Sequence, residues 1–124
     1  MKHDFDLIRE ILLEVERSEP ERLGTLHLIT PRDFSGTEAQ NYHHIRMLVD
    51  RGLLEPAGRP TMQAEFAIHG LTFDGHDFLD AIRDRTVGDV TKDRLREAGG
   101  WTFDSVLAVA KEELKRRLAH AGGG

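Results

Sequence analysis

The stretch from Gln40 to Arg59 carries side chains whose chemistry suits the recognition of nucleic-acid bases. The side-chain amides of Gln40 and Asn41 can each form two hydrogen bonds with an adenine edge, and Arg51 can form two with guanine. His44 lies in the same run, and Arg59 follows in a turn from which an arginine can reach a minor groove or a phosphate. We therefore interpret these five residues as a candidate nucleic-acid-binding face.

The charge of this stretch argues against non-specific binding of nucleic acid. Such binding is driven by the release of counterions from phosphates and needs a basic surface. Between positions 37 and 59 the arginines are matched in number by carboxylates: Arg46, Arg51 and Arg59 stand against Glu38, Asp50 and Glu55. The whole chain of 124 residues carries 17 basic and 22 acidic residues, for a net charge of −5. A solvated or protein-binding face is therefore the alternative interpretation.

A second group of charged residues recurs at helical spacing after position 76. Asp77, Asp80 and Asp84 are three and four residues apart, which places them on one face of a helix. Two carboxylates act as a catalytic acid and base only in an enclosed site that perturbs their pKa values. We expect instead a solvated acidic face that suits a basic protein partner. The sequence has no phosphate-binding loop or dinucleotide fingerprint, and we predict that the protein is not an enzyme.

Seven histidines raise the question of a metal site. His43 and His44 are adjacent, so on a helix they diverge by roughly 100° and do not chelate from one face. His69 and His76 are separated by a predicted turn and cap, and the chain has no cysteine. Structural metal sites usually show tighter ligand spacing than this. We predict no metal and no cofactor.

The sequence does not predict a targeting segment or a membrane-spanning segment. The first six residues carry acid where a signal peptide carries base, and no apolar run approaches the roughly 20 residues that a membrane span needs. The lack of cysteine is compatible with a reducing compartment. We therefore expect a cytoplasmic protein without a membrane partner.

Hydrophobic periodicity predicts the elements that position these groups. Leu7, Ile8, Ile11, Leu12 and Val15 recur at helical spacing, whereas short alternating stretches indicate strands. The predicted order is a helix over 4–17, a strand over 26–29, a turn over 32–36, a helix over 38–51, a strand over 53–55, a turn over 57–61 and a strand over 64–68.

The helix predicted over 38–51 has the clearest boundaries. Thr37 suits its N-cap, and Gly52 suits the left-handed position just after its end. Its predicted inner stripe consists of Tyr42, Ile45, Leu48 and Val49. This assignment turns the polar and flexible side chains outward: Gln40, Asn41, His44 or His43, Met47 and Arg51.

Three further helices are expected after the strands. Their predicted boundaries are a Thr72 cap for a helix over 73–83, a Thr86 or Asp89 cap for a helix that Gly99-Gly100 ends, and a Thr102 or Asp104 cap for the last helix. We expect Trp101 and Phe103 to anchor the last helix to the core. Its apolar stripe includes Leu114 and Leu118, which could pack on the domain or pair with a second copy. These two leucines are therefore candidate protein-interaction residues, and a homodimer through this helix is the preferred assembly.

The order of these elements is typical of a winged helix-turn-helix fold. We predict a mainly α chain with a small β-hairpin or three-stranded sheet and extra C-terminal helices. A single domain would cover residues 1–121, with a core over about 4–85, a helical extension over 86–121 and a flexible tail over 122–124.

Four runs of sequence resemble one known family. They are DLIREILL at 6–13, HIRMLVDRGLL at 44–54, GLTFDGHDFLDAIRD at 70–84 and AGG at 98–100. Together they resemble a small bacterial and phage family known as domain of unknown function 2513. The resemblance implies a winged-helix-like fold and frequent occurrence near mobile or phage-derived genes. It implies no activity.

Two functional hypotheses follow from the sequence. The first is a winged-helix regulator from a phage or mobile element that reads double-stranded DNA with Gln40, Asn41, His44 and Arg51 and contacts the backbone with Arg59. The second is a non-enzymatic protein-interaction module on the same scaffold. Its acidic surface would engage a host or defence-complex protein or mimic nucleic acid.

Overall fold

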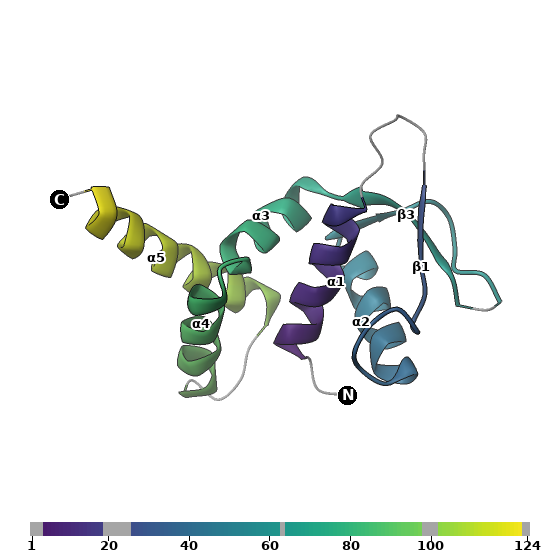
Figure 1. The fold of residues 1–124 in the computed structure, drawn as a ribbon, viewed down its shortest axis with the longest axis horizontal. Helices are drawn as coiled ribbons and strands as arrows, with labels where there is room; N and C mark the ends of the chain where they lie inside the picture. The colour runs from purple at the N-terminus through teal and green to yellow at the C-terminus, as the bar shows by residue number, and fades with distance from the viewer. Residues whose placement is uncertain (1–3, 19–25, 63, 98–101, 123–124) are drawn as a thin grey trace. The chain divides into compact units, whose positions relative to one another are not determined.

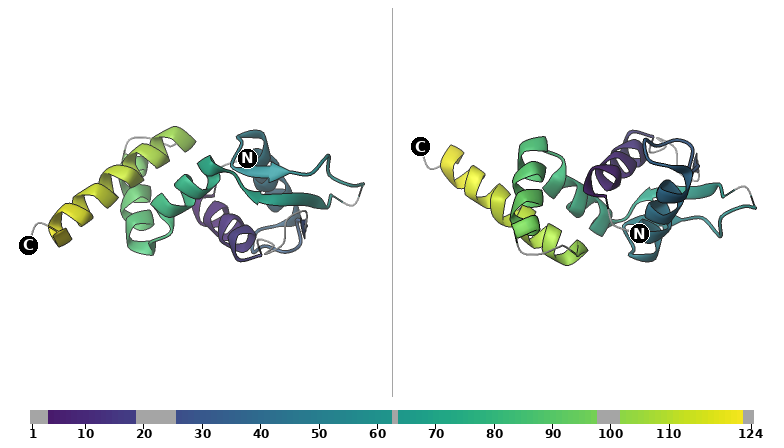
Figure 2. Two further views of the ribbon diagram at one scale, coloured as in Figure 1. Left: turned by 90° about the horizontal axis from the view of Figure 1, so that it is seen from above. Right: turned by 90° about the horizontal axis from the view of Figure 1, so that it is seen from below.

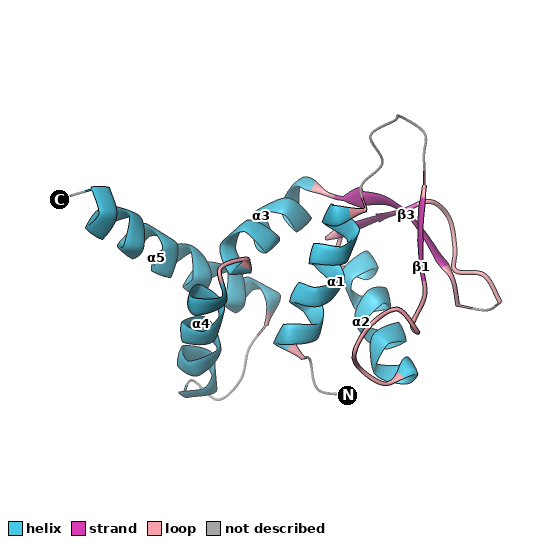
Figure 3. Cartoon of the chain, in the orientation of Figure 1, coloured by secondary structure: helices cyan, strands magenta, loops and turns pink. Residues whose placement is uncertain are grey.

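The computed structural model describes residues 4–18, 26–62, 64–97 and 102–122. Within these ranges the chain is mainly helical, with five helices and one three-stranded antiparallel sheet (Figures 1 and 3). The elements in order are α1 (Phe5–Arg17), β1 (His27–Ile29), α2 (Glu38–Asp50), β2 (Leu54–Pro56), β3 (Phe66–Leu71), α3 (Phe73–Ile82), α4 (Arg85–Glu97) and α5 (Phe103–Gly122). The predicted helical class and small sheet are confirmed.

The chain forms two compact units, residues 1–76 and residues 77–124. The boundary falls inside α3. The first unit contains α1, α2 and the whole sheet, and the second contains the α4–α5 pair.

The sheet of the first unit has the strand order β1-β3-β2, with both pairs antiparallel. Ile29 lies opposite Phe66, and Leu54 lies opposite Leu71. β3 therefore continues past the predicted end at residue 68, because Leu71 completes the pairing with β2. In both views of Figure 2 the chain between β2 and β3 extends away from the helices of this unit.

One core joins the two helices of the first unit to the sheet. α1 packs on α2 and β3, and α2 packs on β2. The predicted apolar stripe of α1 is fully buried, since Leu7, Ile8, Ile11, Leu12 and Val15 are each at most 3% exposed. Complete burial of such side chains stabilises a fold by about 1.5–3 kcal/mol each. This core is what fixes the position of α2.

In the second unit, the start of α4 differs from the prediction. The carboxylate of Asp84 accepts hydrogen bonds from the backbone N–H groups of Thr86 (2.8 Å) and Val87 (3.2 Å). Asp84 is therefore the N-cap, and the predicted caps Thr86 and Asp89 lie inside the helix. The backbone bonds from Val87 and Thr86 lower the pKa of Asp84.

The start of α5 follows the prediction, because the Thr102 hydroxyl accepts a hydrogen bond from the Ser105 backbone N–H at 3.1 Å. The helix extends to Gly122, which the prediction had assigned to the tail. The predicted break at Gly99-Gly100 and the anchoring by Trp101 and the Phe103 side chain lie outside what the structure describes.

Candidate nucleic-acid interface

Both ends of α2 are closed by local hydrogen bonds. At its start, the Thr37 hydroxyl accepts from the Gln40 N–H (3.1 Å), and the Gln40 side-chain oxygen accepts from the Thr37 N–H (3.0 Å). At its end, the Leu53 N–H donates to Leu48 O (2.9 Å), while Gly52 has a positive φ of 76°. The predicted caps are confirmed. Gln40 stays exposed, but its side-chain oxygen is engaged in the cap.

Asn41 is fully buried, so its predicted place on the outer face is wrong. Its side-chain amide donates to the backbone oxygens of Pro31 (2.6 Å), Phe34 (3.1 Å) and Gly36 (3.0 Å). These carbonyls belong to the turn that precedes α2, so they are not paired within a helix or a sheet. A buried carbonyl without a donor is costly, and this explains why a polar residue occupies the inner stripe.

His44 is also fully buried, and its predicted outward placement is likewise wrong. Its Nε2 accepts a hydrogen bond from the Asp4 N–H at 2.8 Å, which requires that nitrogen to carry no proton. Its Nδ1 lies 2.7 Å from Gln40 O, one turn earlier in α2. The neutral ring therefore joins the N-cap residue of α1 to α2 and cannot contact an external ligand.

The buried stripe of α2 is Asn41, His44, Ile45 and Leu48. Ile45 and Leu48 belong to both the predicted and the observed stripe, and at 100° per residue the outward face is rotated by roughly 60° from the predicted one. Tyr42, predicted to point inward, is 36% exposed, and its ring is tilted by 50° to the Phe66 ring at a centroid distance of 5.6 Å. The predicted inner position of Val49 is only half-buried.

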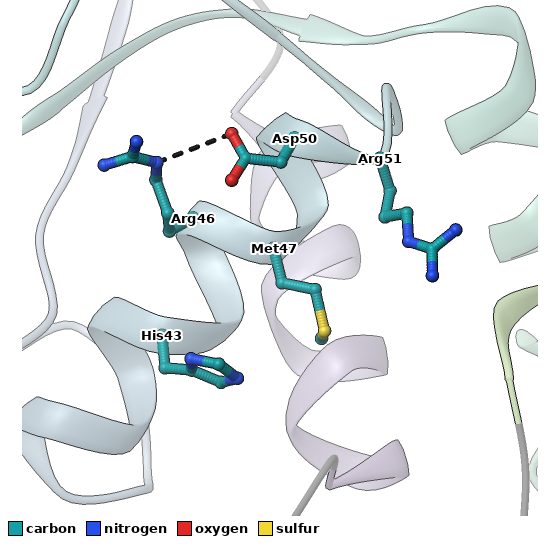
Figure 4. A pocket seen from close by; sticks show the side chains of 5 residues that line it. All are labelled: His43, Arg46, Met47, Asp50 and Arg51. Carbon is teal, nitrogen blue, oxygen red and sulfur yellow. Dashed lines mark hydrogen bonds and ion pairs between the residues drawn. The ribbon is translucent and has the colours of Figure 1, made fainter. Parts of the chain in front are cut away.

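The outward face of α2 in the structure forms an open hollow along the second half of the helix (Figure 4). It is lined by His43, Arg46, Met47, Asp50 and Arg51. Arg46 Nε lies 3.4 Å from Asp50 Oδ1, and both side chains are more than half exposed. A side-chain hydrogen bond with Tyr42 and the charge of Asp50 raise the pKa of Arg46. Arg46 therefore presents a permanent positive charge at the middle of the outward face.

Arg46 and His43 were not among the predicted contact residues. Arg46 had entered only the charge balance of the stretch, and His43 only as a substitute for His44. The signal that identifies Arg46 is its spacing of four residues from both Tyr42 and Asp50, which places all three on one helix face.

The two predicted arginines outside the middle of α2 are exposed. Arg51 is the C-cap residue of α2 and lines the hollow. Arg59 lies in the connection between β2 and β3, near the fully exposed Met62. The Thr61 N–H bonds to Glu65 O (3.0 Å) and the Ala64 N–H bonds to Thr61 O (2.9 Å). These bonds close the turn that carries Met62.

The second predicted cluster does not form an enclosed site. Asp77, Asp80 and Asp84 are exposed, Asp80 is paired with Arg83 at 2.9 Å, and Asp84 caps α4. On α5, Leu114 is half-buried and Leu118 is 69% exposed. Among the described residues there is no group of three or more histidine or acidic side chains that could hold a metal ion. The same residues include no helix that is long and apolar enough to cross a membrane.

The family model described as hypothetical protein (DUF2513) matches residues 2–101. This chain belongs to that family. A relative from Haemophilus influenzae, described as an uncharacterized protein, is 31% identical over 122 residues. The alignment covers 96% of this chain and the whole of that relative. No solved structure matches the chain.

Two of the runs that resemble DUF2513 meet at the end of α2. The Thr72 hydroxyl donates to Gly52 O (2.5 Å), and the Thr72 N–H donates to Leu53 O (3.1 Å). The same hydroxyl accepts from the Gly75 N–H (2.9 Å), which confirms Thr72 as the cap of α3. A Cβ atom on Gly75 would lie 2.1 Å from Leu53 O. A glycine is therefore required at this position for α3 to begin beside Leu53, the residue just before β2.

Proposed function

We propose that this DUF2513 chain is a winged-helix DNA-binding protein in which α2 is the recognition helix and the β2–β3 connection is the wing. The order α1-β1-α2-β2-β3 and the sheet order β1-β3-β2 support this assignment. In helix-turn-helix proteins the second helix enters the major groove of double-stranded DNA. The observation that carries the proposal is the outward face of α2. The buried side chains of Asn41 and His44, which we call the polar clamps, hold this face in place, and the face is open to solvent.

The contact residues of this proposal differ from those predicted from the sequence. Asn41 and His44 are internal, so His43, Arg46 and Met47 take their place at the centre of the face. Arg51 and Gln40 lie at its margin, and Arg59 is the basic residue of the wing. Arginine and exposed amide groups can donate to base edges or phosphates, whereas the Nε2 atom of His43 is buried.

Charge favours a sequence-specific regulator over a general DNA-coating protein. Residues 1–76 carry eight basic and thirteen acidic side chains, which accounts for the whole net charge of −5. A surface of this kind releases few counterions, so non-specific affinity would be low at physiological salt. A non-enzymatic regulator encoded by a phage or mobile element, acting in the cytoplasm, agrees with this charge and with the family resemblance.

The test is selection from a random duplex library at about 100 mM salt, followed by measurement of affinity for the enriched sequence. Ala39 is exposed on the outward face in the first turn of α2, where glutamate is compatible with the helix dipole. Ala39→Glu should weaken binding by about tenfold or more, because the carboxylate would face phosphates. Ala108→Glu, at an exposed alanine of α5, is the matched control and should bind like the wild type. The proposal fails if no duplex is enriched or if Ala39→Glu binds normally.

A protein-interaction module is the second candidate, supported by an apolar edge of the sheet. β1 is an edge strand, and Leu26 and Leu28 beside and within it are 45% and 54% exposed. On this proposal, the chain recovers a protein partner from nuclease-treated host lysate. Leu28→Glu should abolish the recovery and Ala39→Glu should preserve it. Recovery of nucleic acid alone would contradict this candidate.

A further inference from the structure

The guanidinium of Arg46 is held by two neighbouring side chains of α2. Its Nε hydrogen-bonds Asp50 four residues later at 3.4 Å, and Tyr42 four residues earlier is the other side chain that interacts with it. The guanidinium therefore has a neighbour on each side along one face of α2. Its side chain remains 52% exposed, so the group is oriented without being covered.

The bond to Asp50 engages Nε, so it does not use the two terminal nitrogens of Arg46. In Figure 4 these nitrogens lie on the side of the guanidinium away from Asp50. They form the fork that matches two acceptors on a flat partner. In the major groove, the O6 and N7 atoms of guanine present two acceptors side by side, and arginine pairs with both.

We infer that Arg46 reads a guanine in the major groove of double-stranded DNA and that Asp50 is the residue that orients it. This inference rests on the proposed DNA-binding function and names the base that the outward face of α2 selects. In this arrangement Arg51 and Arg59 contact the DNA backbone or adjust how the protein docks on the DNA. An arginine that is already oriented loses less side-chain freedom when it binds, which favours discrimination between bases.

Asp50 has two opposite effects on DNA binding in this arrangement. Its carboxylate orients Arg46, but its negative charge also lies on a surface that approaches phosphates. Asp50→Ala should therefore raise affinity for unrelated duplexes and, at the same time, reduce the preference for guanine. A purely structural role for Asp50 would lower both affinities together.

The deciding experiment uses the full chain and the duplex enriched by selection. Each guanine is replaced singly by 7-deazaguanine, which keeps base pairing and lacks the N7 acceptor. For one guanine, the wild type should lose about 10- to 100-fold in affinity. Arg46→Ala should bind the normal and modified duplexes equally. Arg51→Ala is the matched control, and it should retain the full penalty at that guanine.

The possible failures of this inference are distinct from failure of the proposed function. If a duplex is enriched and Ala39→Glu abolishes binding, but Arg46→Ala retains every 7-deazaguanine penalty, the inference is wrong and DNA binding stands. If no 7-deazaguanine position affects the wild type, the inference is also wrong. If no duplex is enriched, both fall. Circular dichroism of Arg46→Ala should match that of the wild type, because the residue is exposed.

Discussion

Residues 1–76 bury the polar side chains of Asn41 and His44, whereas residues 77–124 bury those of Thr91 and Glu113. In the first unit the buried groups are neutral and join segments that are distant in sequence; the Asp4–His44 bond spans 40 residues. In the second unit the shortest contacts are local, although Glu113 also lies 4.0 Å from Arg94 of α4. Thr91 bonds to Val87 O one turn away, and Glu113 pairs with Arg116 three residues later.

The buried Glu113 of α5 is only 2% exposed and lies among three arginines. Its carboxylate accepts from Arg116 at 2.7 and 2.8 Å, Arg117 Nε lies at 3.5 Å, and Arg94 of α4 lies at 4.0 Å. Burial of a carboxylate is tolerated when such partners satisfy it. The second unit therefore depends on ionisation, whereas the polar clamps of the first unit depend on hydrogen-bond geometry.

This difference indicates what each unit requires from its sequence. The clamps of the first unit hold α2 at a defined rotation, since an amide or imidazole bonds only at particular positions. The ionic cluster of the second unit sets a rotation less strictly, because charge attraction falls off slowly with distance. A surface that reads bases needs the stricter arrangement, and the proposed recognition helix lies in the unit that has it.

The largest effect that tests this comparison is expected at Gly75. A methyl group there would lie 2.1 Å from the backbone oxygen of Leu53, and a backbone atom cannot rotate away. Gly75→Ala should destabilise the first unit by about 3 kcal/mol or more. Amide hydrogen exchange should accelerate in α1, α2 and the sheet. Asp77→Ala, at an exposed position of the same helix, should change stability by less than about 0.5 kcal/mol.

Asn41→Ala should have the next largest effect, about 2–4 kcal/mol, because the three carbonyl groups that share its two N–H donors would lose them. Hydrogen exchange should rise in the 31–36 turn and α2, while α4 and α5 keep their protection. Arg32→Ala, at an exposed position of the same turn, should have little effect. Equal loss of protection in both units would show that the clamp does not act on the first unit alone.

The ends of α2 could be predicted from sequence because caps are local. Thr37 and Gly52 act through residues three or four positions away, and the chain itself shows those neighbours. The rotation of α2 could not be predicted in the same way. The partners of Asn41 and His44 lie up to 40 residues away, and a hydrophobic pattern assigns polar residues to the surface.

The same limit explains the residues of the candidate site. The hydrophobic pattern assigns Asn41 and His44 to the surface and Tyr42 to the inner stripe, and this assignment does not point to Arg46 as a contact residue. The predicted start of α4 was wrong for a simpler reason. Asp84, Thr86 and Asp89 can all act as caps, and their types do not show which one faces the first free N–H groups.

A smaller effect, dependent on pH, is expected for Glu113 in the second unit. Hydrogen bonding from Arg116 lowers the pKa of Glu113 from its ordinary value of 4.5. The stabilisation is therefore fully present above about pH 4.5 and is lost as pH falls through the lowered pKa. Glu113→Gln should weaken the α4–α5 pair at neutral pH and flatten its loss of helicity in acid, measured by circular dichroism. Glu112→Gln changes a 69%-exposed neighbour and should keep the wild-type pH profile.

The smallest effect on folding is expected at Leu118, which separates folding from assembly. Its side chain is 69% exposed, so Leu118→Glu should change the free energy of unfolding by less than about 0.5 kcal/mol. If α5 mediates the homodimer predicted from its apolar stripe, the same variant should nevertheless shift sedimentation from dimer to monomer, because a charge would enter the interface. Leu26→Glu, at an exposed leucine of the first unit, should leave the dimer intact. A wild-type chain that sediments as a monomer at all concentrations would contradict the dimer. The apolar stripe of α5 would then act only in the packing of the second unit itself.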